Sequence, residues 1–195
     1  MLVLLAIAWL VGIIYATIPI FWLAIHPFTT FWRRRQRSPF RVLLPFWAVI
    51  IALALLATYP LFPQQVYRSW IGLVPAAILV ALALKVYRSI SKDFRREQVI
   101  GQAELEPGKH EQKLISSGLH GRIRHPFYLA HLLMLLAWTV GSGLTALYLM
   151  IAVAIISGAL MIWLEDRELE QRFGEAYREY RHRVPALLPF SRGSR

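Results

Sequence analysis

The stretch of sequence that decides the fold begins Arg124-His125-Pro126-Phe127-Tyr128 and ends Leu164-Glu165-Asp166. From 126 to 164 it contains no Asp, Glu, Lys or Arg. A helix that crosses the hydrocarbon core of a bilayer needs roughly 20 apolar residues, so this stretch is long enough for two helices that turn near Gly141-Ser142-Gly143. Such a hairpin returns both polar ends to one face of the membrane, and we expect a site there.

Three further blocks without charged residues lie upstream, at 1–32, 42–67 and 69–84. They predict spans at about 3–25, 42–62 and 70–88, the third of which extends to Arg88 because long basic side chains can reach the interface. The first span lacks the basic start of a cleavable signal peptide, so we expect it to be retained. The sequence therefore predicts an all-α integral membrane protein with five transmembrane helices.

The charge of the chain is distributed unevenly about these spans. The net charge is +11, and Arg68 is the single Lys or Arg outside residues 33–41, 85–124 and 165–195. Basic residues gather in cytoplasmic loops, which predicts an outer N-terminus and a cytoplasmic C-terminus, in a bacterial inner membrane or, for a eukaryotic chain, the endoplasmic reticulum. Topology and contact with anionic membrane lipids account for this charge, so we expect no nucleic-acid partner.

We expect one domain, 1–195, in four parts: three N-terminal spans (1–88), a cytoplasmic cofactor loop (89–124), the helical hairpin (125–164) and a cytoplasmic C-terminal arm (165–195). Within the loop, residues 89–120 are interpreted as a lid or a cofactor-binding segment. In the arm, the spacing of apolar residues predicts an amphipathic helix over Glu165–Arg183. Its stripe is interpreted as packing without ligand contact, and its members are Leu169, Phe173, Tyr177, Tyr180 and Val184.

The polar ends of the hairpin suggest what such a site binds. Pro126 suits the first position of a helix, where free backbone N–H groups and the adjacent Arg124 favour an anionic group. Tyr128 lies one turn inside and can supply a hydroxyl. Glu165 returns to the same level within a run of acidic residues, and its carboxylate can accept a hydrogen bond from a ribose or an amine. The pairing predicts a zwitterionic ligand, unless both clusters only anchor helix ends in the membrane.

The chemistry available to the site is limited by composition. The chain has no cysteine, which excludes disulfides, thiolate metal sites and thiol nucleophiles. The spacing of His and Glu predicts no metal site. We interpret His131 as an interior histidine with a hydrogen bond, and the sequence suggests no partner for His26.

The pattern R-H-P-x-Y, an uncharged hairpin, then E-[ED]-x-x-L-x-x-x-F-G-x-x-Y-x-x-Y-x-x-x-V-P over about 110–190 resembles the isoprenylcysteine carboxyl methyltransferase family. Membrane phospholipid methyltransferases are similar at a greater distance. The resemblance implies S-adenosylmethionine at the cytoplasmic face and a lipidic or prenylated acceptor that arrives from the bilayer. The cofactor contacts that it implies are Leu114, Ile115, Gly118, His120, His125, Pro126, Tyr128 and Glu165. Catalytic roles are expected for Arg124, Glu165 and His120.

Two positions depart from the family's pattern. His120 stands where the family usually has Tyr, and Met161 stands where it has the arginine thought to hold a prenylcysteine carboxylate. Met161 therefore argues against that substrate, unless Arg122 or Arg167 substitutes, and the head group of the acceptor stays open. Because a sulfonium methyl is already activated, transfer mainly needs alignment. An amine acceptor would also need a base, for which His120 or Glu165 is a candidate.

Two other classes of function compete with methyl transfer. The R-H-P-x-Y half also resembles sterol-type reductases that use NADPH, but this chain is short and has Phe127 where those enzymes usually carry Asn. A membrane scaffold without catalysis remains if the two polar clusters lie apart. The absence of charges inside the spans argues against a transporter. The oligomeric state is open, with a monomer as one possibility.

Overall fold

The computed structural model describes residues 1–34, 39–93 and 114–188, and over these ranges the chain is all-α. The all-α prediction is therefore confirmed for the described residues. The helices, with three short 3-10 turns, are α1 (Leu2–Leu23), η1 (His26–Phe28), α2 (Thr29–Arg34), α3 (Phe40–Thr58), η3 (Ser69–Gly72), α4 (Leu73–Asp93), η4 (Gly118–Gly121), α7 (Pro126–Ser142), α8 (Thr145–Phe173) and α9 (Glu175–Arg183); a further 3-10 turn, η2, spans Tyr59–Leu61.

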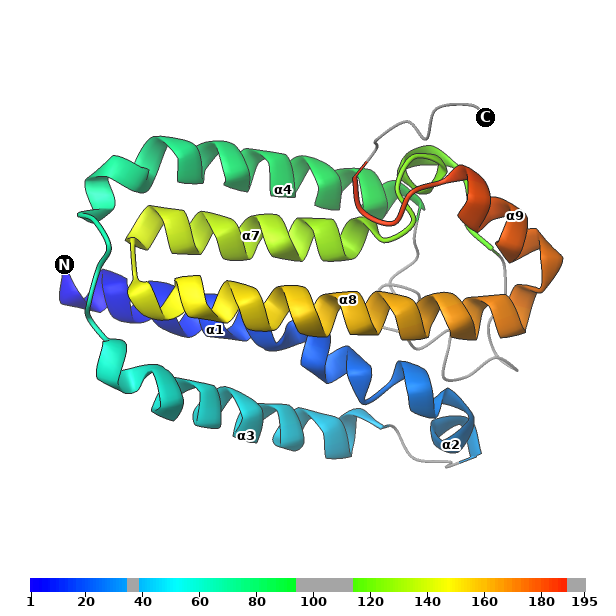
Figure 1. Ribbon diagram of the computed structural model, residues 1–195, viewed down its shortest axis with the longest axis horizontal. Coiled ribbons are helices and arrows are strands. Elements are labelled where there is room, and N and C mark those ends of the chain that lie inside the picture. Colours follow the sequence, from blue (N-terminus) through cyan, green and yellow to red (C-terminus); the bar gives the residue numbers. More distant parts are fainter. Residues whose placement is uncertain (35–38, 94–113, 189–195) are drawn as a thin grey trace.

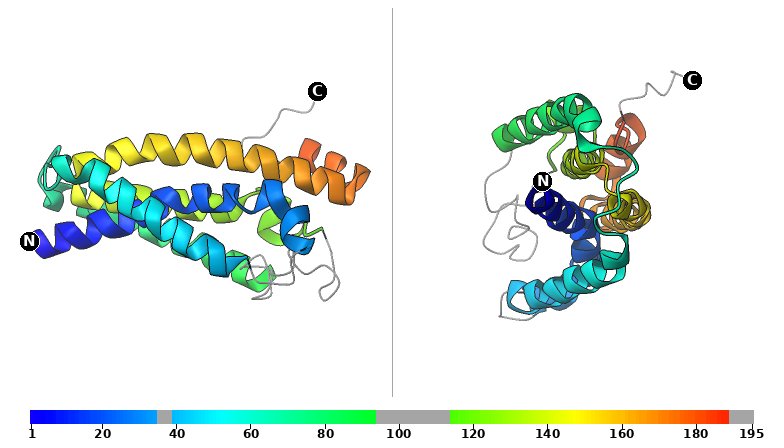
Figure 2. Two further views of the ribbon diagram at one scale, coloured as in Figure 1. Left: turned by 90° about the horizontal axis from the view of Figure 1, so that it is seen from below. Right: turned by 90° about the vertical axis from the view of Figure 1, so that its left-hand side faces the viewer.

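The long helices lie side by side with α7 inside the bundle (Figures 1 and 2). Helix α4 packs on α7, α1 packs on both α7 and α8, and α3 lies outside against α1. The main core forms where α1, α7 and α8 meet, around the buried side chains of Ile13, Leu135 and Leu147. The hairpin that carries the motif is therefore held from both sides by the N-terminal helices.

Four helical segments are long and apolar enough to cross a membrane: Leu2–Trp32, Phe40–Leu61, Trp70–Ser91 and Thr145–Phe173. Helix α7 is apolar but shorter, with 17 residues, or about 25 Å of rise. Four of the five expected spans thus meet the length requirement, and a full crossing by α7 stays a prediction.

The loop between α3 and α4 holds the turn between α7 and α8. Gly143 has a φ of +70°, and its carbonyl accepts a hydrogen bond from Val66 N at 2.8 Å. The Tyr67 hydroxyl donates to Val140 O at 2.7 Å. At Gly72 an added Cβ would lie 1.8 Å from Val140 O, so the backbone of η3 packs directly against the backbone of α7 with no room for a side chain. These contacts fix the hairpin at the end far from its polar clusters.

The C-terminal arm differs from the single helix expected over Glu165–Arg183. Helix α8 continues from the membrane to Phe173 and stops at Gly174, whose φ of +58° folds α9 back. The side chains of the predicted stripe still pack together across this bend, and Leu114 packs against them. The stripe residues are Leu169, Phe173, Tyr177, Tyr180 and Val184. The three- and four-residue spacing of the apolar side chains continues through Gly174, so the sequence pattern could not reveal that the helix ends there.

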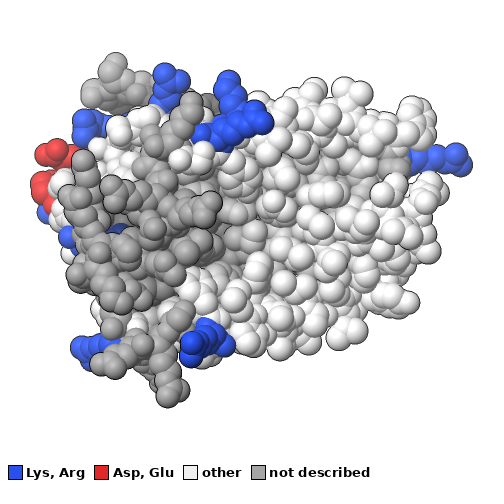
Figure 3. Space-filling view, turned by 180° about the vertical axis from the view of Figure 1, so that it is seen from behind, with Lys and Arg blue, Asp and Glu red and all other residues white. Residues whose placement is uncertain are grey.

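Charged side chains gather at one end of the molecule. On the face seen in Figure 3, most charged side chains gather at that end, a broad belt without charges follows, and a lone basic side chain lies at the other end. Arg68 belongs to the loop between α3 and α4, which contacts the turn between α7 and α8 far from the polar clusters. We call the first end the charged end; that it faces the cytoplasm stays a prediction.

Candidate functional site

His125 lies at the centre of a cluster at the charged end. It is the residue before α7, and its ring lies between the carboxylates of Glu165 and Asp166, which are consecutive on α8. Nε2 is 2.9 Å from Asp166 Oδ1, and Nδ1 is 3.2 Å from Glu165 Oε2. The two halves of the motif, separated by the whole hairpin, therefore meet in one ion-paired group.

The pair of carboxylates decides the charge of His125. Burial lowers the pKa of this imidazole, but the attraction of Glu165 and the hydrogen bond to Asp166 outweigh burial and raise the pKa to about 9. The ring is therefore an imidazolium at neutral pH, and both of its nitrogens carry a proton toward a carboxylate. A buried charge in this position is stable because it is paired on both sides.

Asp166 holds the other members of the cluster in place. It is 3% exposed, and besides His125 it accepts a hydrogen bond from Arg124 Nη2 at 2.7 Å and one from the Tyr177 hydroxyl. Burial raises the pKa of Tyr177 well above its usual range, so the hydroxyl remains a donor. The sequence placed Asp166 only within an acidic run, although the second acidic position of E-[ED] was a signal for it. Tyr177, interpreted as packing, is a polar contact as well.

The V-P segment at the end of the motif is hydrogen-bonded through its backbone to the R-H segment at the beginning of the motif. Arg124 N donates to Pro185 O at 2.9 Å, and His125 N donates to Ala186 O at 3.0 Å. Arg124 Nη1 also donates to Val184 O at 2.6 Å. The V-P segment thus runs alongside the R-H segment and fixes the direction in which both side chains leave the backbone.

His26 is a member of the site that the sequence did not reveal. It lies just after α1 and is 4% exposed, and its Nε2 is 3.5 Å from the Tyr128 hydroxyl. It also interacts electrostatically with Glu165. The expectation that His26 has no partner is therefore wrong. Its only signal was the His26-Pro27 break at the charged end of the first span.

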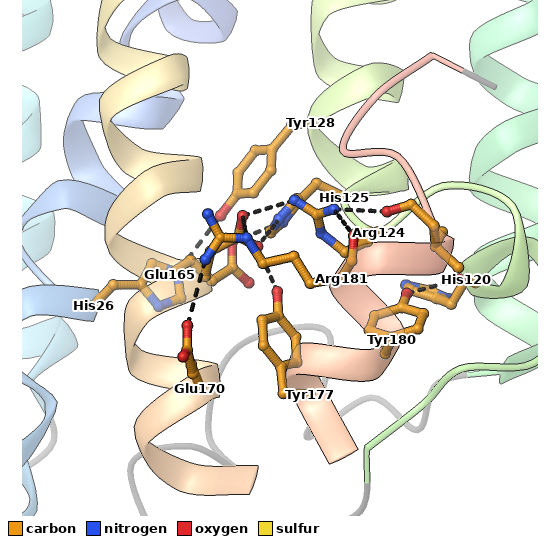
Figure 4. Close-up of polar contacts among 12 residues, drawn as sticks. His26, His120, Arg124, His125, Tyr128, Glu165, Glu170, Tyr177, Tyr180 and Arg181 are labelled. Carbon is orange, nitrogen blue, oxygen red and sulfur yellow. Dashed lines mark hydrogen bonds and ion pairs between the residues drawn. The ribbon is translucent and has the colours of Figure 1, made fainter. Parts of the chain in front are cut away.

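The remaining predicted site residues lie around this cluster. His120, in η4, is buried, and its carbonyl accepts a hydrogen bond from Tyr180 at 2.7 Å, on the side of the cluster away from His26 (Figure 4). Pro126 is buried at the start of α7, while Leu114 packs against the aromatic residues of α9. Gly118 begins η4 with a φ of +58°. The structure thus joins Arg124, His125, Tyr128 and Glu165 directly, and it places His120 beside α9.

Two predictions concern segments around the cluster. Ile115 is half-buried, and most of the proposed lid, 94–113, lies outside the described residues. Met161 is fully buried, and Arg167 stacks over the exposed Trp163 with its guanidinium carbon 3.7 Å from the ring centre. The stacked Arg167 has a partner of its own, which weakens it as a substitute for the missing arginine.

The cluster offers a buried donor and a buried carboxylate to a ligand. Arg124 Nε is buried and has no hydrogen-bond partner among the described residues, and the buried Glu165 Oε2 has the His125 ring, 3.2 Å away, as its ion-pair partner. The amino-acid part of S-adenosylmethionine carries a carboxylate and an ammonium, which match this donor and this acceptor. Over the ranges that the structure describes, no group of three or more His, Asp or Glu side chains could hold a metal ion. Arg124 and Glu165 therefore suit a ligand that carries both a carboxylate and an ammonium group.

Comparison with known proteins confirms the resemblance found in the motif. The chain is 32% identical over 90 residues to protein-S-isoprenylcysteine O-methyltransferase B of Arabidopsis thaliana, covering 42% of each chain. It is 38% identical over 72 residues to methanethiol S-methyltransferase 2 of Bradyrhizobium diazoefficiens, covering 36% of this chain and 27% of the relative.

A reductase also matches. The chain is 33% identical over 132 residues to Delta(14)-sterol reductase of Mus musculus, covering 60% of this chain and 31% of the relative. The chain thus spans less than half the length of each of these relatives. No family model and no solved structure matches it. It is similar to membrane methyltransferases, and the membrane helices agree with that similarity.

Proposed function

We propose that this chain is an integral-membrane methyltransferase that uses S-adenosylmethionine and methylates a lipidic acceptor at the cytoplasmic face. The observation that carries the proposal is the His125 ring held between the carboxylates of Glu165 and Asp166, with Arg124 paired to Asp166. Both motif halves are needed to build it. A cluster that only anchored helix ends would not require a buried donor without a partner, such as Arg124 Nε.

In this proposal the cluster binds the amino-acid part of the cofactor. Arg124 Nε donates to its carboxylate, and Glu165 Oε2 accepts from its ammonium or from a ribose hydroxyl. Asp166 and the V-P segment hold Arg124 and His125, so that little reorganisation accompanies binding. When bound, the cofactor supplies an activated methyl group on a sulfonium. The chain's share of catalysis is then alignment and exclusion of water, and Tyr128 and His26 border the place where alignment is needed.

The acceptor is proposed to be apolar and to arrive from the bilayer. On the face seen in Figure 3 the belt without charges adjoins the charged end, where the cluster lies, and the acceptor is proposed to approach along this belt. Buried Met161 lies where the family has an arginine, which disfavours a carboxylate head group. The relative named for methanethiol supports an acceptor without a carboxylate.

A nicotinamide-dependent reductase is the second candidate. Its support is the sterol reductase relative, whose match covers 60% of this chain. NADPH would require a surface for its phosphates. Arg124 lies two residues before α7, but its Nη atoms are already bonded to Asp166 and to the backbone carbonyls of Arg181 and Val184, which leaves little of it for a phosphate.

Transfer of a labelled methyl group tests the proposal. The purified protein is incubated with methyl-labelled S-adenosylmethionine and a membrane lipid extract, and the lipids are then separated. We expect label in a lipid fraction with the wild type and none with Glu165→Gln. Oxidation of NADPH in a parallel reaction, without labelled lipid, would instead favour the reductase.

A further inference from the structure

A second polar cluster lies one turn deeper along α7 than Tyr128. His131 is three residues after Tyr128 and therefore lies on a neighbouring part of the same helix face. The ring centre of His131 is 5.9 Å from that of Tyr15 on α1 and 5.7 Å from that of Tyr87 on α4. We call these three residues the niche. Two of them come from helices outside the segment that carries the family resemblance.

The hydrogen bonding of His131 fixes which of its nitrogens is basic. Nδ1 is 2.7 Å from Phe127 O, and a carbonyl oxygen only accepts, so Nδ1 carries the proton. In the neutral ring the lone pair is then on Nε2, which has no hydrogen-bond partner among the described residues. The expected interior hydrogen bond of His131 is thus present, but it uses only one nitrogen.

The niche lies where α1 and α4 meet α7. His131, Tyr15 and Tyr87 are each half-buried, so each keeps some exposed surface. Helices α1 and α4 each pack on α7, and the niche lies on the face of α7 between them. His131 is five residues after Pro126, about 7.5 Å along the helix, which is inside the apolar belt but close to its edge.

We propose that the niche binds the polar head of the methyl acceptor, and that His131 is a catalytic base for a weakly acidic S–H or aromatic O–H group. This inference rests on the proposed methyl transfer. A nitrogen lone pair accepts a hydrogen bond from a thiol or a phenol, whereas it faces a carboxylate with repulsion. Thiols and phenols have a pKa of about 8.5–10, within reach of an imidazole, and aliphatic hydroxyls do not.

The acceptor's sulfur or oxygen forms a bond to the methyl carbon while its proton passes to His131 Nε2. The electron pair of the broken methyl–sulfonium bond stays with the cofactor's sulfur, which becomes a neutral thioether. His131 then releases its proton to water. The rings of Tyr15 and Tyr87 lie beside the base, and the two side chains are hydrogen-bonded to each other.

Binding of matched probes without cofactor tests the niche separately from catalysis. Decanethiol and 4-decylphenol carry the acidic proton, decyl methyl sulfide lacks it, and decanoate replaces it with a carboxylate. We expect the wild type to bind decanethiol or the phenol about 3- to 10-fold more tightly than the sulfide, as one hydrogen bond allows. His131→Phe removes this preference, while the matched His182→Phe, on exposed α9, keeps it.

Catalysis gives a second readout. His131→Gln is expected to lower kcat about 10²- to 10⁴-fold with the preferred acidic probe, to remove the rise of the rate with pH, and to leave binding of S-adenosylhomocysteine unchanged. Equal binding of decanethiol, the phenol and the sulfide by the wild type would overturn the niche, as would a preference that survives His131→Phe. A preference that depends on His131 in a protein that binds no S-adenosylhomocysteine would uphold the niche and overturn the methyltransferase.

Discussion

Replacing Asp166 by Asn removes the negative charge that joins Arg124, His125 and Tyr177 while it keeps the size of the side chain. The variant loses two charge-assisted hydrogen bonds, at 2.7 Å from Arg124 and 2.9 Å from His125. Each is worth about 1.5–3 kcal/mol, and removing one partner of a buried ion pair costs about 3–5 kcal/mol. We therefore expect the free energy of unfolding to fall by about 3–5 kcal/mol.

For a chain of this length that loss lowers the melting temperature by about 6–20 °C, measured in detergent by circular dichroism. Glu170→Gln is the matched control, because Glu170 is partly exposed and pairs with Arg178 and Arg181 at 3.6 and 3.4 Å. A surface pair contributes about 0–1 kcal/mol, so the control should melt close to the wild type. Equal shifts in the two variants would refute the view that Asp166 organises the site.

Three further perturbations test other parts of the account. The contribution of His125 to the free energy of unfolding should be complete at pH 6.5 and fall by about 3 kcal/mol as the pH rises through 9, because the pKa of His125 is raised from 6.5 to about 9 in the folded protein; denaturation at a series of pH values from 6.5 upward should show the fall, and His125→Gln should lack it. Gly72→Ala brings a Cβ to 1.8 Å from Val140 O and should destabilise the hairpin by at least about 1–3 kcal/mol, measured by thermal melting; an unchanged midpoint would contradict the close approach. Tyr177→Phe removes a hydrogen bond to Asp166 and should cost about 1.5–3 kcal/mol in the same assay, whereas no loss would mean that the hydroxyl only packs.

The sequence was sufficient for those parts of the fold that depend on composition along the chain. Uncharged blocks predicted where helices of membrane length lie, and the uncharged stretch between Arg124 and Glu165 predicted a hairpin with both ends on one side. The packing of α4 on α7 and of α1 on α8 did not follow from the hairpin, because these helices are distant in sequence. The break at Gly174 was missed because the apolar spacing continues through it, and only the positive φ separates α8 from α9.

The site was predicted less completely, for reasons of geometry. His26 and Tyr128 are 102 residues apart, and nothing local to His26 indicates that α1 ends beside α8. Glu165 and Asp166 are adjacent on a helix and point about 100° apart, so the sequence favoured one of them. The His125 ring lies between the two side chains and contacts both, which only the packing of α7 on α8 determines.

Calorimetric titration of the detergent-purified protein with S-adenosylhomocysteine tests the central claim most directly, with Glu165→Ala as the variant and NADPH as the competing ligand. The account predicts that the wild type binds S-adenosylhomocysteine, that Glu165→Ala loses this binding, and that NADPH gives no heat. Binding of NADPH alone would contradict the methyltransferase and favour the reductase. Binding of neither ligand would leave the cluster of His125, Glu165 and Asp166 as a purely structural feature.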